Sequence, residues 1–131
     1  MKLFSFGKNK KLLNNRQFKA VLDCQHRASD DLLIVYMGSN SVDHARLGVS
    51  VRKSCGNAVV RNRLKRLIRE VFRQNQDKIP SGFDYVVMIS QKWSTAAGDF
   101  ADIKKAAKNL KFDRVERSFL GLVEKIAVNL S

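Results

Sequence analysis

GNAVVRNRLKRLIREVFR, residues 56–73, is the stretch on which both the fold and the function of this chain depend. Its apolar residues recur every three or four positions, the spacing of one face of an α-helix. The residues on that face are Val60, Leu64, Leu67, Ile68, Val71 and Phe72. Gly56 and Asn57 supply a loop and a helix cap before them, and the Pro-Ser-Gly at 80–82 predicts an end near Asp77.

The opposite face of this predicted helix is cationic. Its outer positions hold Asn62, Lys65, Arg66, Arg69 and Arg73, with Arg61 and Arg63 at the edges of the apolar stripe. Like charges four residues apart destabilise a helix by roughly a few tenths of a kcal/mol. Glu70 offsets only a small part of this repulsion. A solvated face usually mixes signs, so this one indicates a phosphate-bearing partner. The pattern alone does not separate DNA from RNA, because a major-groove helix has a similar composition.

The predicted helix lies between two predicted strands, 45–51 and 83–90. A strand, a helix and a strand in succession form a βαβ unit with two parallel strands. The remaining predicted elements are a helix from residue 14 or 15 to 24, strands at 27–29 and 31–38, and helices near 99–110 and 113–128. The class is α+β with a small mixed sheet, and residues 1–131 form a single domain in which 1–13 are a basic, mobile arm.

The chain has 131 residues and a formal net charge of +13. Residues 1–27 hold seven basic residues and one acidic residue, and residues 52–73 hold eight and one. A positive charge concentrated in two segments is typical of proteins that bind polyanions. Cys24 and Cys55 form no metal-binding pair, and free thiols are favoured over a disulfide. No apolar run reaches 18 residues, so we expect a cytoplasmic protein that binds no membrane.

Carboxylates and histidines do not converge on a hydrolytic site in the sequence. Asp30 and Asp31 are typical of a turn before a strand, and Asp99 and Asp102 of a helix start, where acids suit the helix dipole. Neither histidine stands in a Ser-His-Asp or metal-ligand pattern. We therefore expect no catalytic residue, no metal site and no activity from the protein alone.

The run from Gly56 to Glu70 resembles the signature of the bacterial ribonuclease P protein family. That signature reads roughly Gly-Asn-Ala-Val-x-Arg-Asn-Arg-x-Lys-Arg-x-x-Arg-Glu, and the named positions match here. The resemblance extends to residues 12–22, 33–37 and 83–89, while the helical tail at 93–131 is less family-like.

This resemblance implies a two-layer α/β sandwich whose βαβ unit has a left-handed crossover, a fold also found in ribosomal proteins. It implies two partners, the catalytic RNA of ribonuclease P and precursor tRNA, with no further protein required. The implied reaction is the Mg²⁺-dependent endonucleolytic removal of the 5′ leader. The RNA carries the catalysis, and the Mg²⁺ is held mainly by the RNA.

Two sets of site residues follow from the resemblance. Those implied to bind the catalytic RNA are Arg52, Lys53, Arg61, Asn62, Arg63, Lys65, Arg66 and Arg69. A cleft for the single-stranded leader is implied at Phe18, Leu22, Ile34 and Tyr36. Aromatic side chains stack unpaired bases without demanding a sequence, although Phe18 and Tyr36 are equally compatible with core packing.

The sequence departs from the family pattern at several positions. Arg-Lys-Ser-Cys at 52–55 stands where Ser-Lys-Lys and an aliphatic residue are usual, and Leu22 stands where many members have an aromatic residue. Four lysines in the tail, at 104, 105, 108 and 111, either extend the RNA surface or form a solvated side. There are two alternative functions. The chain could be a general RNA-binding module of ribosomal type or a dimeric DNA-binding regulator.

Overall fold

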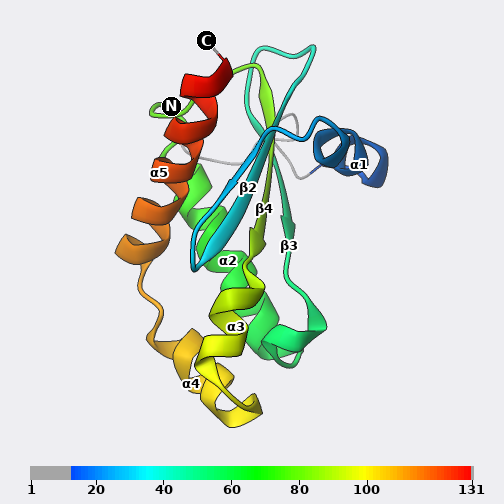
Figure 1. Ribbon diagram of the computed structural model, residues 1–131. Helices are drawn as coiled ribbons and strands as arrows, with labels where there is room; N and C mark the ends of the chain where they lie inside the picture. Colours follow the sequence, from blue (N-terminus) through cyan, green and yellow to red (C-terminus); the bar gives the residue numbers. More distant parts are fainter. Residues whose placement is uncertain (1–12, 131) are drawn as a thin grey trace.

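The computed structural model describes residues 13–130, in which a four-stranded sheet has helices on both faces (Figure 1). The strands are β1 (Arg27–Ser29), β2 (Leu33–Ser39), β3 (Arg46–Ser50) and β4 (Phe83–Ile89). The helices are α1 (Asn15–Asp23), the 3₁₀ helix η2 (Lys53–Cys55), α2 (Ala58–Gln74), α3 (Gln91–Ala97), α4 (Phe100–Asn109) and α5 (Phe112–Leu130). The expected basic arm lies outside the described residues except for Leu13. No described helix is long and apolar enough to cross a membrane.

The strand order is β1-β2-β4-β3, and β2 runs antiparallel to both of its neighbours. β3 and β4 are parallel, and α2 is part of the chain that connects them. The α+β class, the mixed sheet and the βαβ unit around the basic helix are therefore confirmed. The left-handed sense of the crossover stays a prediction from the family resemblance.

The apolar stripe of α2 packs onto one face of the sheet. The Asn57 side chain caps the helix by accepting a hydrogen bond from the Val60 amide at 3.0 Å. Val60, Leu64, Ile68, Val71 and Phe72 are buried, as the periodicity predicted, whereas Leu67 on the same predicted face is only half-buried. α5 lies on the same face, and the rings of Phe72, Tyr85 and Phe119 meet there with centroids 5.8 to 6.3 Å apart.

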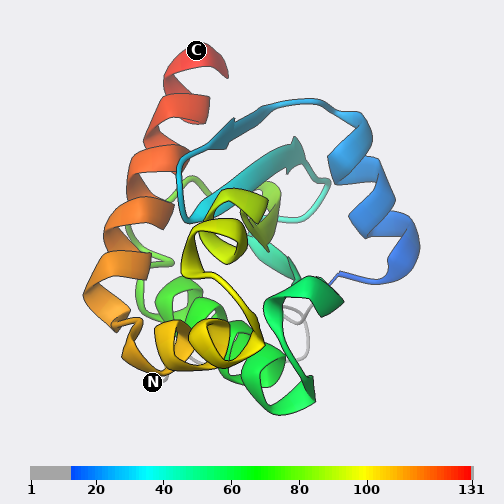
Figure 2. The same ribbon diagram turned by 60° about the horizontal axis from the view of Figure 1, so that its bottom comes forward.

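Helix α1 lies on the opposite face of the sheet from α2 and α5 (Figure 2). Along β2 the side chains of Leu33, Val35 and Met37 enter the main core, whereas Ile34 and Tyr36 alternate with them and are half-buried. Gly48 on β3 permits the close approach of α1, because a Cβ there would stand 2.8 Å from the ring of Phe18. Phe18 thus rests directly on the sheet backbone.

The structure differs from the sequence prediction at several element ends. β2 begins at Leu33 instead of residue 31, because the Asp30 carboxylate accepts the amides of Leu32 and Leu33 and holds a turn. α2 ends at Gln74 instead of Asp77, where the Asn75 side chain donates to the Val71 carbonyl at 2.7 Å. The helices η2 and α3 were not predicted at all.

Candidate nucleic-acid interface

The outer face of α2 is the first part of the candidate interface, and we call it the cationic face. Its members are Arg61, Asn62, Arg63, Lys65, Arg66 and Arg69. Asn62, Arg63 and Arg66 are exposed, and the other three are half-buried. They lie opposite the apolar stripe of the helix or at its edge, and the Nε atoms of Arg61 and Arg69 are buried with no hydrogen-bond partner among the described residues. The structure therefore brings six of the eight predicted RNA-binding residues onto one surface.

Arg63 differs from its neighbours because its guanidinium group is already engaged. Its Nε donates to the carbonyl of Ala107 at 3.2 Å, and its Nη2 donates to the carbonyl of Lys108 at 2.9 Å. These carbonyls belong to the last turn of α4, which has no further helical turn to satisfy them. Arg63 thus ties α2 to α4, a role that the sequence pattern did not predict.

Glu70 is the acidic residue within the cationic stretch, and its carboxylate turns toward the end of α2. It pairs with Arg73 and accepts a hydrogen bond from the Gln74 amide group at 2.8 Å. The hydrogen bonds from Arg73 and Gln74 lower the pKa of Glu70 to about 2. Arg66, one turn before Glu70, forms no ion pair within residues 13–130. Its guanidinium is therefore available to a partner.

The remaining two predicted RNA-binding residues, Arg52 and Lys53, lie just after β3 and are both exposed. Arg52 donates from Nη1 to Oε1 of Gln91 at 2.9 Å. Gln91 begins α3 directly after β4, so this contact joins the carboxyl ends of the two parallel strands. The sequence did not predict it, because it depends on which strands are neighbours.

The second part of the candidate interface is the half-exposed apolar surface beside α1, which we call the apolar strip. It comprises Phe18, Leu22, Ile34, Tyr36 and Met88. All five side chains are half-buried. The four residues predicted for the leader cleft thus lie on the same side of the sheet, and Met88 joins them.

The register of the strands orders this strip into two rows. Tyr36 pairs with Val86, which pairs with Gly48, and Phe18 lies over Gly48. In the next row Ile34 pairs with Met88, which pairs with Ser50. Val86 in the first row is fully buried, whereas every member of the second row is half-exposed. Arg52 follows Ser50 by two residues, so the open row ends beside a cation.

Tyr36 is also in contact with a cation at the other edge of the sheet. The guanidinium of Arg27 on β1 stands 5.8 Å from the centre of the Tyr36 ring, and its Nη1 donates to the tyrosine hydroxyl at 3.4 Å. The Tyr36 ring is thus not a core residue. An aromatic ring flanked by a cation and partly open to solvent is suited to contact with an unpaired base.

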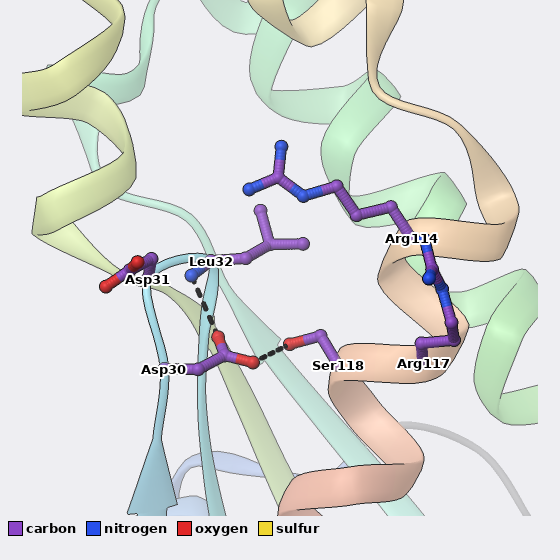
Figure 3. Close-up of a pocket in the computed structure, with 6 residues that line it drawn as sticks. All are labelled: Asp30, Asp31, Leu32, Arg114, Arg117 and Ser118. Carbon is purple, nitrogen blue, oxygen red and sulfur yellow. Dashed lines mark hydrogen bonds between the residues drawn. The ribbon is translucent and has the colours of Figure 1, made fainter.

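Three of the four paired carboxylates, Asp30, Asp99 and Asp102, have structural partners, and Asp31 is exposed. Asp30 Oδ2 accepts the Ser118 hydroxyl of α5 at 2.5 Å, beside a hollow also lined by Arg114 and Arg117 (Figure 3). Burial alone would raise the pKa of Asp30, but its hydrogen bonds and the nearby Arg114 charge lower it. Asp99 and Asp102 form the capping box of α4. Within residues 13–130, no group of three or more His, Cys, Asp or Glu side chains is placed to hold a metal ion.

Comparisons with known proteins agree on one family. The family model described as Ribonuclease P matches residues 6–113. The ribonuclease P protein component of Clostridium kluyveri is 41% identical over 102 residues, which cover 76% of this chain and 89% of that protein. The corresponding protein of Petrotoga mobilis is 33% identical over 122 residues, which cover 93% of this chain and 95% of that protein.

Solved structures give the same result at the level of the fold. The ribonuclease P protein of Thermotoga maritima superposes with a TM-score of 0.72 at 30% identity, covering 87% of this chain and 96% of that one. The ribonuclease P protein of Staphylococcus aureus superposes with a TM-score of 0.68 at 29% identity, covering 90% and 94%. The chain, with its basic crossover helix and four-stranded mixed sheet, belongs to the ribonuclease P protein family.

Proposed function

We propose that this chain assists the removal of the 5′ leader from precursor tRNA by binding two RNAs on two surfaces. The cationic face of α2, with Arg52 and Lys53, binds the catalytic RNA. The apolar strip beside α1 holds the single-stranded leader. The proposal is supported by family membership and by the physical difference between the two surfaces, one cationic, the other apolar and half-exposed.

The cationic face is suited to folded RNA because its charges are dense and little neutralised. Each phosphate that a Lys or Arg neutralises releases condensed counterions, which favours binding at low salt. Arginine predominates over lysine on this face, and guanidinium groups can bind phosphate oxygens through two parallel hydrogen bonds. Asn62, at the centre of the face, can both donate and accept, so it can contact base edges as well.

The apolar strip is suited to a single strand whose sequence varies. Stacking on an aromatic ring contributes about 1–3 kcal/mol per base and hardly depends on which base is stacked. Phe18 and Tyr36 supply rings, and Ile34 and Met88 supply an apolar floor. We assign the protein no cleavage step of its own.

The Mg²⁺ that the reaction requires is proposed to be held mainly by the RNA. Mg²⁺ prefers six oxygen ligands and often binds through phosphates with a few carboxylates. The carboxylates of the described residues do not converge in such a set. No step proposed for this chain therefore involves the ion.

The proposal is tested by reconstitution with a bacterial ribonuclease P RNA. A 5′-extended precursor tRNA is incubated at low Mg²⁺ with the RNA alone, with the protein alone and with both. We expect accurate cleavage with both and little with either component. If the protein binds the RNA without restoring cleavage, the general RNA-binding alternative replaces this proposal.

A further inference from the structure

Helix α4 lies beside α2 at the same end of the molecule (Figures 1 and 2). Its buried residues Ile103 and Ala107 pack inward, together with Leu110 just beyond its end. The Arg63 guanidinium fixes the carboxyl end of α4 to the cationic face through the carbonyls of Ala107 and Lys108. The position of α4 relative to the cationic face is therefore set by both apolar packing and hydrogen bonds.

The outer side of α4 and of the corner after it carries several positive charges, as the outer face of α2 does. The side chains of Lys104, Lys105, Lys108 and Lys111 are all exposed, and none forms an ion pair within residues 13–130. Asp99 and Asp102 are used in the capping box at the other end of the helix, and Asp113, two residues after Lys111, lies in the first turn of α5. Lys104 and Lys108 stand four residues apart, where like charges repel across one turn.

A hollow of about 340 Å³ joins the two helices. Arg63, Arg66, Leu67 and Glu70 of α2 line one side, and Leu110 at the corner between α4 and α5 lines the other. Lys111 follows Leu110 in the chain, and Lys108 lies one half-turn before it. The hollow thus has Leu67 and Leu110 as apolar lining and two arginines and one glutamate of α2 as charged lining, and the lysines lie near it in the chain rather than in its wall.

We infer that α4 extends the RNA-binding surface of α2, with Lys104, Lys105, Lys108 and Lys111 contacting the phosphate backbone of the catalytic RNA across this hollow. The inference rests on the proposed function, because it takes the partner of the cationic face as its own. An acidic protein would be an alternative occupant for lysines alone. The lysines continue the arginine-rich face of α2, and like charges repel one another within each helix. Both features favour a chain of phosphates as the partner.

The test compares three variants of the full-length chain. The first replaces Lys104, Lys108 and Lys111 by Gln. The second replaces the same three by Arg, which keeps the charge. The third is a matched control that removes three exposed charges outside α2 and α4, at Lys78, Arg117 and Lys125. Circular dichroism and thermal unfolding establish that each variant has the wild-type fold before binding is measured.

The measurement is the affinity of each protein for the ribonuclease P RNA across a range of salt concentrations. We expect the Gln variant to bind about tenfold or more weakly at low salt. Its slope of log affinity against log salt should fall by about two to three, since each phosphate contact contributes about 0.7–0.9. The Arg variant and the control should resemble the wild type.

The outcomes separate this inference from the proposed function. If the wild type binds the RNA and the Gln variant binds equally well with the same slope, α4 is a solvated side and the inference is overturned. The inference is also overturned if the control variant weakens binding as much as the Gln variant, because the loss of affinity then depends only on the net charge of the protein. If the wild type itself does not bind the RNA, the proposed function and this inference both fail.

Discussion

Arg63 and Arg66 show how two neighbouring arginines of one helix face can have different tasks. Both are exposed on the cationic face, and both match the family signature. Arg63 donates to two carbonyls of the last turn of α4, whereas Arg66 forms no ion pair among residues 13–130. Arg66 is therefore the cleaner probe of RNA binding, and Arg63 is the probe of how α4 is held.

Replacing Arg63 by Gln should lower the free energy of unfolding by about 1 kcal/mol, because two carbonyls lose a charged donor at a partly exposed site. Replacing Arg66 by Gln should change it by less than about 0.5 kcal/mol, as is usual for a surface residue without partners. Urea unfolding of the two variants measures both values. Equal losses in the two variants would contradict the assigned role of Arg63.

The lowered pKa of Glu70 means that the free energy of unfolding should depend on pH in the acid range. Its folded pKa of about 2 lies below the ordinary value of 4.5, chiefly because Arg73 and then Gln74 donate hydrogen bonds to it. A lowered pKa gives stability that is complete above about pH 4.5 and is lost as the pH falls toward 2. The pair is half-exposed and solvent screens its charges, so we expect the effect on stability to be small.

The measurement is the difference in unfolding free energy between the wild type and Glu70→Gln from pH 6 to pH 2. The difference should shrink over that range and should be smaller in high salt, which screens exposed charges. A difference that stays constant with pH would show that the carboxylate charge has no part in it.

At the residue scale, the sequence predicted which side of α2 is buried, because helical period and hydrophobicity determine it locally. Val60, Leu64, Ile68, Val71 and Phe72 are buried as predicted. The partners of Arg52 and Arg63 were not predictable, since Gln91 and Ala107 are 39 and 44 residues away in the chain. Contacts of that separation depend on the tertiary arrangement.

At the scale of elements, the Phe18 side chain of α1 packs directly on the backbone of β3, because Gly48 has no side chain there. A Cβ on Gly48 would stand 2.8 Å from Cδ2 of Phe18 and 3.3 Å from Cδ1 of Leu13. Gly48→Ala should therefore move the Phe18 ring off the sheet and lower the stability by about 1 kcal/mol or more. The same variant should weaken the binding of the leader.

Gly121→Ala is the matched control for this substitution. Gly121 is exposed within α5, and a Cβ there meets nothing within 4 Å. Alanine is the better helix former, so this variant should gain up to about 1 kcal/mol. Thermal unfolding and precursor tRNA affinity of both variants provide the comparison. A Gly48→Ala protein as stable as the wild type, with unchanged affinity, would contradict the contact between α1 and β3.

Element prediction succeeded for the strands and for the long periodic helices, and it failed for the two short helices η2 and α3. α2, α4, α5 and all four strands were predicted in type, with ends that differ by a few residues. α3 has seven residues and depends on the Ser90 cap and on the burial of Trp93. Those interactions require the end of β4 to be in place, so local sequence did not reveal them.

At the scale of the whole molecule, the tail from residue 93 onward is part of the core. Phe119 of α5 packs against Phe72 of α2 and Tyr85 of β4. Phe119→Ala should therefore cost about 3–5 kcal/mol, as is usual when a large buried ring is removed. Leu120→Ala, at a half-buried position of the same helix, should cost clearly less.

Unfolding followed by both helix content and the fluorescence of Trp93, which is buried just after β4, checks this prediction. The two signals should move together to lower denaturant in Phe119→Ala, because α5 and the sheet share one core. A variant in which α5 melts while the sheet signal keeps the wild-type midpoint would show that the tail is a separate unit.

Strand order and the division into two surfaces were the features that the sequence alone could not supply. Ile34 and Tyr36 share a face of β2, and Met88 and Ser50 join them through pairing between strands far apart in the chain. The family resemblance supplied the leader assignment, and the register supplies the physical reason to propose it. The account thus depends most on the two surfaces having different RNA partners.

The measurement that tests this claim most directly is the preference of the reconstituted holoenzyme for precursor tRNA over mature tRNA. The ratio of the two affinities is compared for the wild type, Phe18→Ala and Arg66→Gln, each at protein concentrations that saturate the catalytic RNA. The account predicts that Phe18→Ala reduces the ratio by about fivefold or more, the equivalent of at least one lost stacking contact, while Arg66→Gln leaves it unchanged. A ratio that Phe18→Ala does not alter, or that Arg66→Gln lowers equally, would contradict the separation of the two surfaces.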